Sequence, residues 1–433
     1  MSDLRFEVEG WIGSAWGAAE ERATTGAFRI AAGEDLHLSL TKVEDTIGQT
    51  LRSHIHVPVV SVGTWLLMNW WRLRWERKPA RPGSNWVQAH RLSGIGGDHA
   101  WPCLEFSSDG EFIHLEMEAE PVPDVSAIRY VQPASLDVAA ADFEGAVERL
   151  LDVVESRLAS VLPGYRALGE LRAELAEERA DATLATNCRW QALAGMDPGE
   201  ASEAWLRSAR ELVEEVGEEA GDEVMGALPD LREGLSAANG VVRGMKQSSV
   251  TVDLSWVRSA QRVLPARELP WQRGIRLAQE VRARHQLGTG PLGNRTLSDL
   301  LATSLPLQGE PSTFAIVGGF RNGVAGGRTM ILWKSRRNES QRFYLARLVG
   351  AAHLLSPNQH LVPVTDTATA LQKFERSFAR EFLCPWEALN AFTEDHGVDD
   401  ETLIDAAEYF QVSEYLVRST LVDWGKVPRN RLP

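Results

Sequence analysis

Cysteine is scarce in this chain, and the features that mark secreted or membrane-spanning proteins are missing. Its three cysteines, Cys103, Cys188 and Cys384, form no Cys-x-x-Cys pair, so neither a disulfide framework nor a structural zinc knuckle is predicted. No stretch approaches about 18 uninterrupted apolar residues, and the first residues lack the basic-then-apolar run of a signal peptide. We therefore expect a cytoplasmic protein without a membrane span.

Positive charge is also in deficit. The chain has 45 Lys and Arg residues against 60 Asp and Glu residues, which gives a formal net charge of -15. This balance does not favour a protein that coats DNA or RNA through its phosphates, although a local basic patch stays open. No Gly-Lys-Ser/Thr phosphate loop and no Gly-x-Ser-x-Gly nucleophile elbow is present. The 433 residues suit two or three domains, each able to bury its own core.

Two different patterns divide the first part of the chain. Residues 1–130 contain short alternating runs between turn residues and predict a β-rich domain. Inside it, the apolar stretch Val62–Glu76 predicts one long helix. Residues 131–265 place apolar side chains three and four apart, which predicts a helical region. Its acidic run, Glu211–Glu223, is interpreted as a solvated helix face, with a partner-binding surface as the alternative.

A third pattern, of helices around a small hairpin, covers residues 266–433. The expected helices are Trp271–His285, Leu297–Thr303, Arg342–Leu355 and Thr367–Leu383, and the expected strands are Thr313–Phe320 and Arg328–Trp333, joined by a turn at Gly323–Gly327. Together the three regions predict an α+β fold.

Three segments between Arg267 and Val427 carry motifs in a definite order. They are Gln341–Ala351, Phe378–Pro385 and Ala406–Val417. These segments resemble, in turn, the Arg-Phe-Thr-Leu-Ala-His-Glu-Leu-Gly-His, Phe-Ala-Ala-Glu-Leu-Leu-Met-Pro and Phe-x-Val-Ser motifs of the ImmA/IrrE family of zinc endopeptidases. The resemblance implies a zincin-like domain with a lead-in helix, a hairpin, a metal helix and a second ligand-bearing helix.

The residues that carry the chemistry of such a site are replaced here. A zincin site takes two His four apart on one helix, a Glu beside the first as general base, and a carboxylate from the next helix. In the register of the resemblance, Arg347, Leu348 and Ala351 stand at the first His, the Glu and the second His. A guanidinium keeps its proton and has no lone pair for a metal, and the other two side chains offer neither base nor ligand. The resemblance therefore implies a pseudo-peptidase with no catalytic residue and no metal.

Two acids, Glu375 and Glu381, remain near the position of the family's carboxylate ligand. One hypothesis and one alternative follow for what has become of the metal site. Arg347 is expected to take the place of the cation and to pair with Glu375 or Glu381. The alternative is an active zinc endopeptidase that uses a rearranged site of His353, His360 and Glu375, the only case in which zinc is expected as a cofactor. In either case the resemblance implies a protein partner and a role in stress response, a toxin–antitoxin pair or phage defence.

A further alternative places the function in the β-rich domain. Trp70, Trp71, Arg72 and Arg74 lie together in the predicted apolar helix, and an aromatic stripe of this kind first predicts packing. Combined with arginine, it could also bind a peptide or stack the bases of single-stranded nucleic acid, which the net charge does not favour.

Histidine is concentrated in the same domain. His54 and His56 are expected on one face of a strand, and His90, Asp98 and His99 lie near predicted turns. Ordinary surface and core histidines are the first interpretation, and a metal or acid–base site is the alternative.

Overall fold

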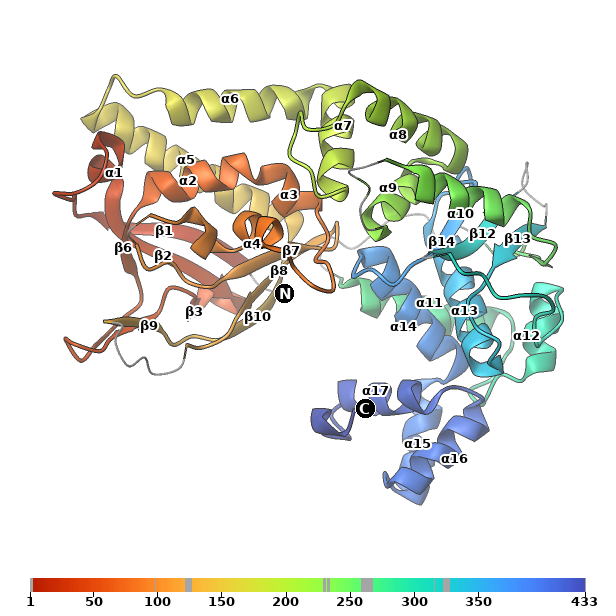
Figure 1. Ribbon diagram of the computed structural model, residues 1–433. Helices are drawn as coiled ribbons and strands as arrows, with labels where there is room; N and C mark the ends of the chain where they lie inside the picture. The colour runs from red at the N-terminus through yellow and green to blue at the C-terminus, as the bar shows by residue number, and fades with distance from the viewer. Residues whose placement is uncertain are drawn as a thin grey trace. The chain divides into compact units, whose positions relative to one another are not determined.

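The chain folds into two compact units, Met1–Ser202 and Glu203–Pro433. The computed structural model describes residues 3–97, 99–120, 127–228, 231, 234–257, 268–314, 316–321 and 328–432 (Figure 1). Strands dominate the start of the first unit, whereas the second consists mainly of helices around one small sheet. The predicted α+β fold is confirmed. The boundary between the units lies inside the predicted helical region 131–265, so its helices belong partly to each unit.

In its described residues, the first unit contains three small antiparallel sheets. Its strands are β1 (Asp3–Trp11), β2 (Thr25–Gly33), β3 (Leu38–Ser39), β4 (Val43–Asp45), β5 (Thr50–Arg52), β6 (Ile55–Pro58), β7 (Glu105–Ser108), β8 (Phe112–Met117), β9 (Ile128–Tyr130) and β10 (Ala134–Ala139). They pair in the orders β1-β2-β3 with β6 beside β2, β10-β8-β7, and β5-β4-β9. Leu4 and Phe6 of β1 are buried and alternate with the exposed Asp3 and Arg5, as the two-residue period of a half-buried strand requires.

The first unit also contains helices, several of which pack against these sheets. They are α1 (Ala19–Thr24), α2 (Val59–Met68), α3 (Trp70–Trp75), α4 (Ser84–His90), α5 (Ala140–Val161), α6 (Ala167–Ala180) and α7 (Ala182–Leu193). The long helix α5 contacts β1, β8 and β10, and its buried stripe includes Phe143, Val147, Leu150 and Val154. These buried residues lie three and four apart, which is the spacing that predicted a helix from the sequence.

The prediction of one helix over Val62–Glu76 is wrong. The segment forms two helices, α2 and α3, because Asn69 between them has non-helical angles, with φ -102° and ψ 9°. Its side-chain Nδ2 donates to the carbonyl of Trp65 at 2.8 Å. A short polar side chain that competes for backbone groups in this way interrupts a helix.

The second unit is built on helices around a four-stranded antiparallel sheet of order β11-β13-β12-β14. Its elements are α8 (Glu203–Val216), α9 (Glu218–Ala227), α10 (Ser236–Lys246), β11 (Thr251–Val252), α11 (Pro270–Arg284), α12 (Asn294–Leu301), β12 (Val317–Arg321), β13 (Thr329–Leu332), α13 (Asn338–Leu354), β14 (Leu361–Val364), α14 (Ala370–Leu383), α15 (Trp386–His396), α16 (Asp400–Phe410) and α17 (Glu414–Asp423). The predicted helices and strands of this region all occur, whereas the turn predicted at Gly323–Gly327 lies outside the described residues.

Three helices meet at the centre of this unit, and glycine permits their close approach. A Cβ atom built on Gly350 of α13 would lie 3.0 Å from the ring of Phe378 in α14, and one on Gly274 of α11 would lie 2.3 Å from the carbonyl oxygen of Phe374. Helix α14 therefore lies tightly between α11 and α13, and the side chains on its α13 face are held in place. Within the described part of the chain, no helix has the length and apolarity that crossing a bilayer requires.

Candidate functional site

The replaced motif positions all lie on α13, in the core of the second unit. Leu348 and Ala351 are fully buried, and Arg347 is 7% exposed. Positions 347 and 351 are four apart and therefore share one face of the helix, as two metal-binding histidines would. The neighbouring helix α14 presents Glu375 to Arg347.

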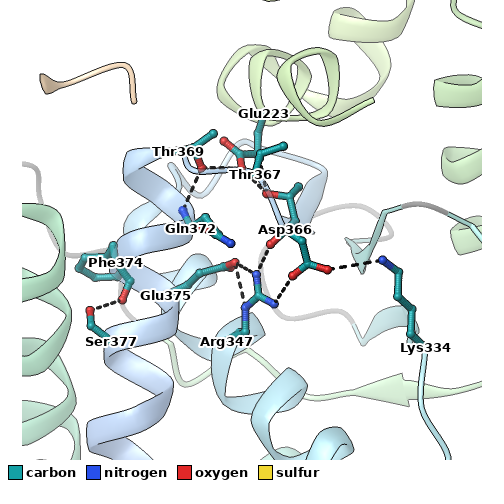
Figure 2. A network of polar contacts seen from close by, with 11 residues as sticks. Glu223, Lys334, Arg347, Asp366, Thr367, Thr369, Gln372, Phe374, Glu375 and Ser377 are labelled. Carbon is teal, nitrogen blue, oxygen red and sulfur yellow. Dashed lines mark hydrogen bonds and ion pairs between the residues drawn. The ribbon is translucent and has the colours of Figure 1, made fainter. Parts of the chain in front are cut away.

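Arg347 makes a dense set of contacts through its guanidinium group. Its Nε and Nη2 donate to Oε1 of Glu375 at 3.1 and 2.5 Å, and its Nη1 lies 3.2 Å from Oδ1 of Asp366. Nη2 also donates to the carbonyl oxygen of Thr365. Figure 2 shows the guanidinium between the two carboxylates. The expected pairing of Arg347 with Glu375 is confirmed.

The two carboxylates that face Arg347 differ in environment. Burial raises the pKa of Glu375 to about 8, although Arg347 acts in the opposite direction. Asp366 is mostly exposed, and Arg347 and Lys334 more than offset its partial burial, so its pKa is lowered. Asp366 therefore supplies the countercharge of Arg347 at neutral pH. Glu375 is mostly protonated below a pH of about 8.

A third acid approaches the site from α9. Glu223 is 5% exposed, and its Oε1 accepts from the hydroxyls of Thr365 at 2.6 Å and Thr369 at 2.8 Å (Figure 2). The interpretation of the whole run Glu211–Glu223 as a solvated face is therefore wrong at its end, whereas Glu211 itself is exposed. Glu223 anchors α9 to the loop that carries Asp366.

Glu381 does not take part in this network. It is 5% exposed, accepts from the Nε2 of Gln279 at 3.0 Å, and accepts from the backbone N–H of Trp386 at 3.1 Å. Its role is to join α14 to α11 and to the start of α15. Cys384, close by, is fully buried, and burial raises the pKa of its thiol well above the usual range, as expected for an inert packing residue.

The residues of the rearranged zinc site are engaged elsewhere. His353 is 1% exposed, and its ring lies among the aromatic rings of Trp256 and Phe378, with centroids 6.0 and 6.2 Å away. His360 lies beyond α13, and its Nδ1 is 3.1 Å from the carbonyl oxygen of Glu215. Among the residues that the structure describes, no group of three or more His, Cys, Asp or Glu side chains is arranged to hold a metal ion.

A cavity of about 440 Å³ opens beside Arg347. Its walls come from α11, the strand ends of the sheet, α13, α14 and α17. The volume falls in the range of small-ligand sites, about 300–1,000 Å³. Arg347 and Asp366 form part of its wall.

The tryptophans and arginines of the first unit are committed to internal contacts. Trp70 and Trp71 are 3% and 7% exposed, and the Nε1 of Trp71 donates to Glu178 at 2.6 Å. Arg72 pairs with Glu76 at 2.6 Å, and the Arg74 side chain pairs with Glu144 at 2.9 Å. These four side chains pack and pair within the unit, which favours the packing interpretation over a binding surface.

The histidines of the first unit fall into separate places. The rings of His54 and His56 stack at 5.4 Å on one face of the strand region, as the alternation predicts. His90 is fully buried and stacks on Trp86 at 4.2 Å, and burial lowers its pKa to about 4. Asp98 lies outside the described residues.

Sequence reasoning missed Asp366, Thr365 and Glu223. One signal was available, because Asp366 follows closely on the apolar strand Leu361–Val364, and polar side chains at strand ends often line sites. Nothing local marks Glu223, since its partner Thr365 is 142 residues away.

The chain matches no protein-family model, no curated protein and no solved structure. The likeness to the ImmA/IrrE family therefore rests on the three sequence segments and on the order of elements around them.

Proposed function

We propose that the second unit is a catalytically degenerate, zincin-like scaffold that binds a protein partner in the cytoplasm and serves a regulatory role, in stress response, a toxin–antitoxin pair or phage defence. One observation carries the proposal. The guanidinium of Arg347 pairs with Glu375, the acid nearest to the expected third ligand, at 2.5 Å. A permanent cation beside that carboxylate repels Zn²⁺, and a guanidinium has no lone pair with which to bind a metal or accept a proton from water, so the unit is suited to binding rather than to hydrolysis.

Metal content is the direct test. The purified, untagged protein should contain no zinc by elemental mass spectrometry, and Glu375→Gln should not change this result. Near-stoichiometric zinc that falls in the Glu375→Gln variant would overturn the proposal and revive the peptidase with a rearranged site.

A gain-of-metal variant tests whether α13 and α14 form a zincin frame. Arg347→His/Ala351→His places two imidazoles four apart, and Glu375 already lies within hydrogen-bonding distance of position 347. This set of two His and one Glu is a known zinc-binding combination. The variant should acquire zinc, and the added change Glu375→Gln should abolish the gain.

Because Ala351 is fully buried, a histidine there can overpack the core. Arg347→His/Ala351→Cys supplies a smaller ligand for the same test. If both variants fold by circular dichroism and neither binds zinc, the zincin-like frame is refuted.

A further inference from the structure

The cavity beside Arg347 is positively charged in a chain with a large negative charge. Its walls contain more cationic than anionic side chains, namely Lys334, Arg347, Lys373, Arg376 and Arg380 against Glu339 and Asp366. The chain as a whole has a net charge of -15. A local excess of cations attracts an anionic ligand, even though the net charge of the chain is negative.

Most of these cations have internal partners, and Arg376 is the exception. Asp366 lies 3.2 Å from Arg347 and 3.7 Å from Lys334, and Arg380 pairs with Asp423 at 2.5 Å. Arg376 is exposed, and its guanidinium carbon lies 5.9 Å from the centroid of the Phe343 ring. Within the described part of the chain no carboxylate forms an ion pair with it, so it is available to an incoming carboxylate.

The shape of the cavity favours an extended ligand. Exposed aromatic side chains, Trp271 and Tyr415, form part of its walls. A second groove shares Glu339, Ser413 and Tyr415 with it and continues along Ile404, which is 46% exposed. A cationic cavity that adjoins a groove lined by both apolar and charged side chains suits a peptide with an acidic residue and neighbouring apolar side chains better than a compact anion.

We propose that this cavity binds an acidic peptide segment of a partner protein, with a carboxylate at Arg376 and an apolar side chain along Tyr415. The inference rests on the proposed function, since it names the surface and the chemistry by which the scaffold would hold its partner. Arg376 would supply charge-assisted hydrogen bonds to the carboxylate.

A peptide selection tests this proposal with the full chain. Random peptides displayed on phage are selected on the wild-type protein and on Arg376→Glu in parallel. Peptides from the wild-type selection should be rich in Asp and Glu beside aromatic or aliphatic residues. By calorimetry, Arg376→Glu should weaken the best peptide at least about tenfold, and so should replacement of its acids by Asn and Gln.

Two further variants keep the test specific. Arg295→Glu makes the same charge change on α12 at a side chain that is 96% exposed and does not line the cavity, and it should leave the affinity unchanged. Tyr415→Ala should weaken the peptide without changing the fold, because Tyr415 is half exposed.

The outcomes distinguish a failure of the peptide site from a failure of the proposed scaffold function. Selected peptides without acidic enrichment, or an affinity that Arg376→Glu and Arg295→Glu change equally, would overturn the peptide site. Binding of ATP or inorganic phosphate that Arg376→Glu abolishes, with no peptide selected, would assign the cavity to a small phosphate compound instead. In each case a zinc-free protein leaves the scaffold proposal standing, whereas bound zinc removes it.

Discussion

Arginines and aromatic rings gather in two regions of this protein, and the two regions use them differently. In the first unit, Arg74 pairs with Glu144 at 2.9 Å and lies 4.4 Å from the centroid of the Trp75 ring. In the second unit, Arg376 lies over Phe343 but meets no carboxylate partner among the described residues. The same kind of cation–aromatic contact therefore belongs to a neutralised surface in one unit and to a charged cavity in the other.

The difference lies in partners that are remote in sequence. Glu144 comes from α5, 70 residues after Arg74, and it removes from the segment the positive charge that a nucleic acid or acidic peptide would need. A run of tryptophan and arginine is thus no evidence of a binding surface until its long-range carboxylates are known. The predictions below test this contrast.

The largest effect is expected from Arg347→Met. The substitution leaves two buried acceptors, Glu375 and the carbonyl oxygen of Thr365, without their donor, and each unsatisfied buried acceptor costs about 1–3 kcal/mol. Chemical denaturation at neutral pH measures the change. Arg347→Met/Glu375→Leu removes both groups and should recover much of the loss, so equal destabilisation in both variants would show that the pair contributes little.

Trp71→Ala should destabilise the first unit by about 3 kcal/mol, because the side chain is 7% exposed and its removal leaves a cavity. Trp71→Phe keeps most of the packing and loses the hydrogen bond to Glu178, at a cost of about 1 kcal/mol. Thermal unfolding compares the two. A variant Trp71→Ala of unchanged stability that loses affinity for single-stranded DNA would restore the binding interpretation of this segment.

Periodicity and motifs alone predicted a large part of this architecture. The α+β class and the helices of the second unit were both accessible, because helical spacing is a local property of the chain. The contact between Arg347 and Glu375 was also predicted, although it joins two helices. The pairing could be predicted because the resemblance supplied the juxtaposition of two helices.

Other features depended on contacts that the sequence does not display. The break at Asn69 interrupts a segment whose apolar pattern continues across it. The burial of Glu223 depends on Thr365 and Thr369, which lie on another part of the unit. A residue type and its neighbours predict a helix face, but only tertiary packing decides whether that face meets water.

Glu375→Gln should alter the pH dependence of stability. Because the folded-state pKa of Glu375 is raised from 4.5 to about 8, its contribution is fully present below pH 4.5 and is lost as the pH rises through 8. Gln cannot ionise, so the variant should gain about 2 kcal/mol of stability relative to the wild type between about pH 6 and pH 7.5. Urea denaturation at both pH values measures this, with exposed Glu387→Gln as the control for removing one negative charge. A stability difference that does not change between the two pH values would mean that the carboxylate is ionised throughout.

The smallest effects come from the matched pair Arg376→Ala and Arg74→Ala, which addresses the comparison directly. Arg376 is exposed and has no ion-pair partner among the described residues, so its loss should change the free energy of unfolding by no more than about 0.5 kcal/mol. Arg74 donates to Glu144 at 2.9 Å and to the carbonyl of Gly110 at 2.8 Å, and its loss should cost about 1 kcal/mol. Denaturation of both variants in one buffer measures the difference. If Arg376→Ala were the more destabilising, Arg376 would be structural and the cavity would lose the cation that is free to meet a ligand.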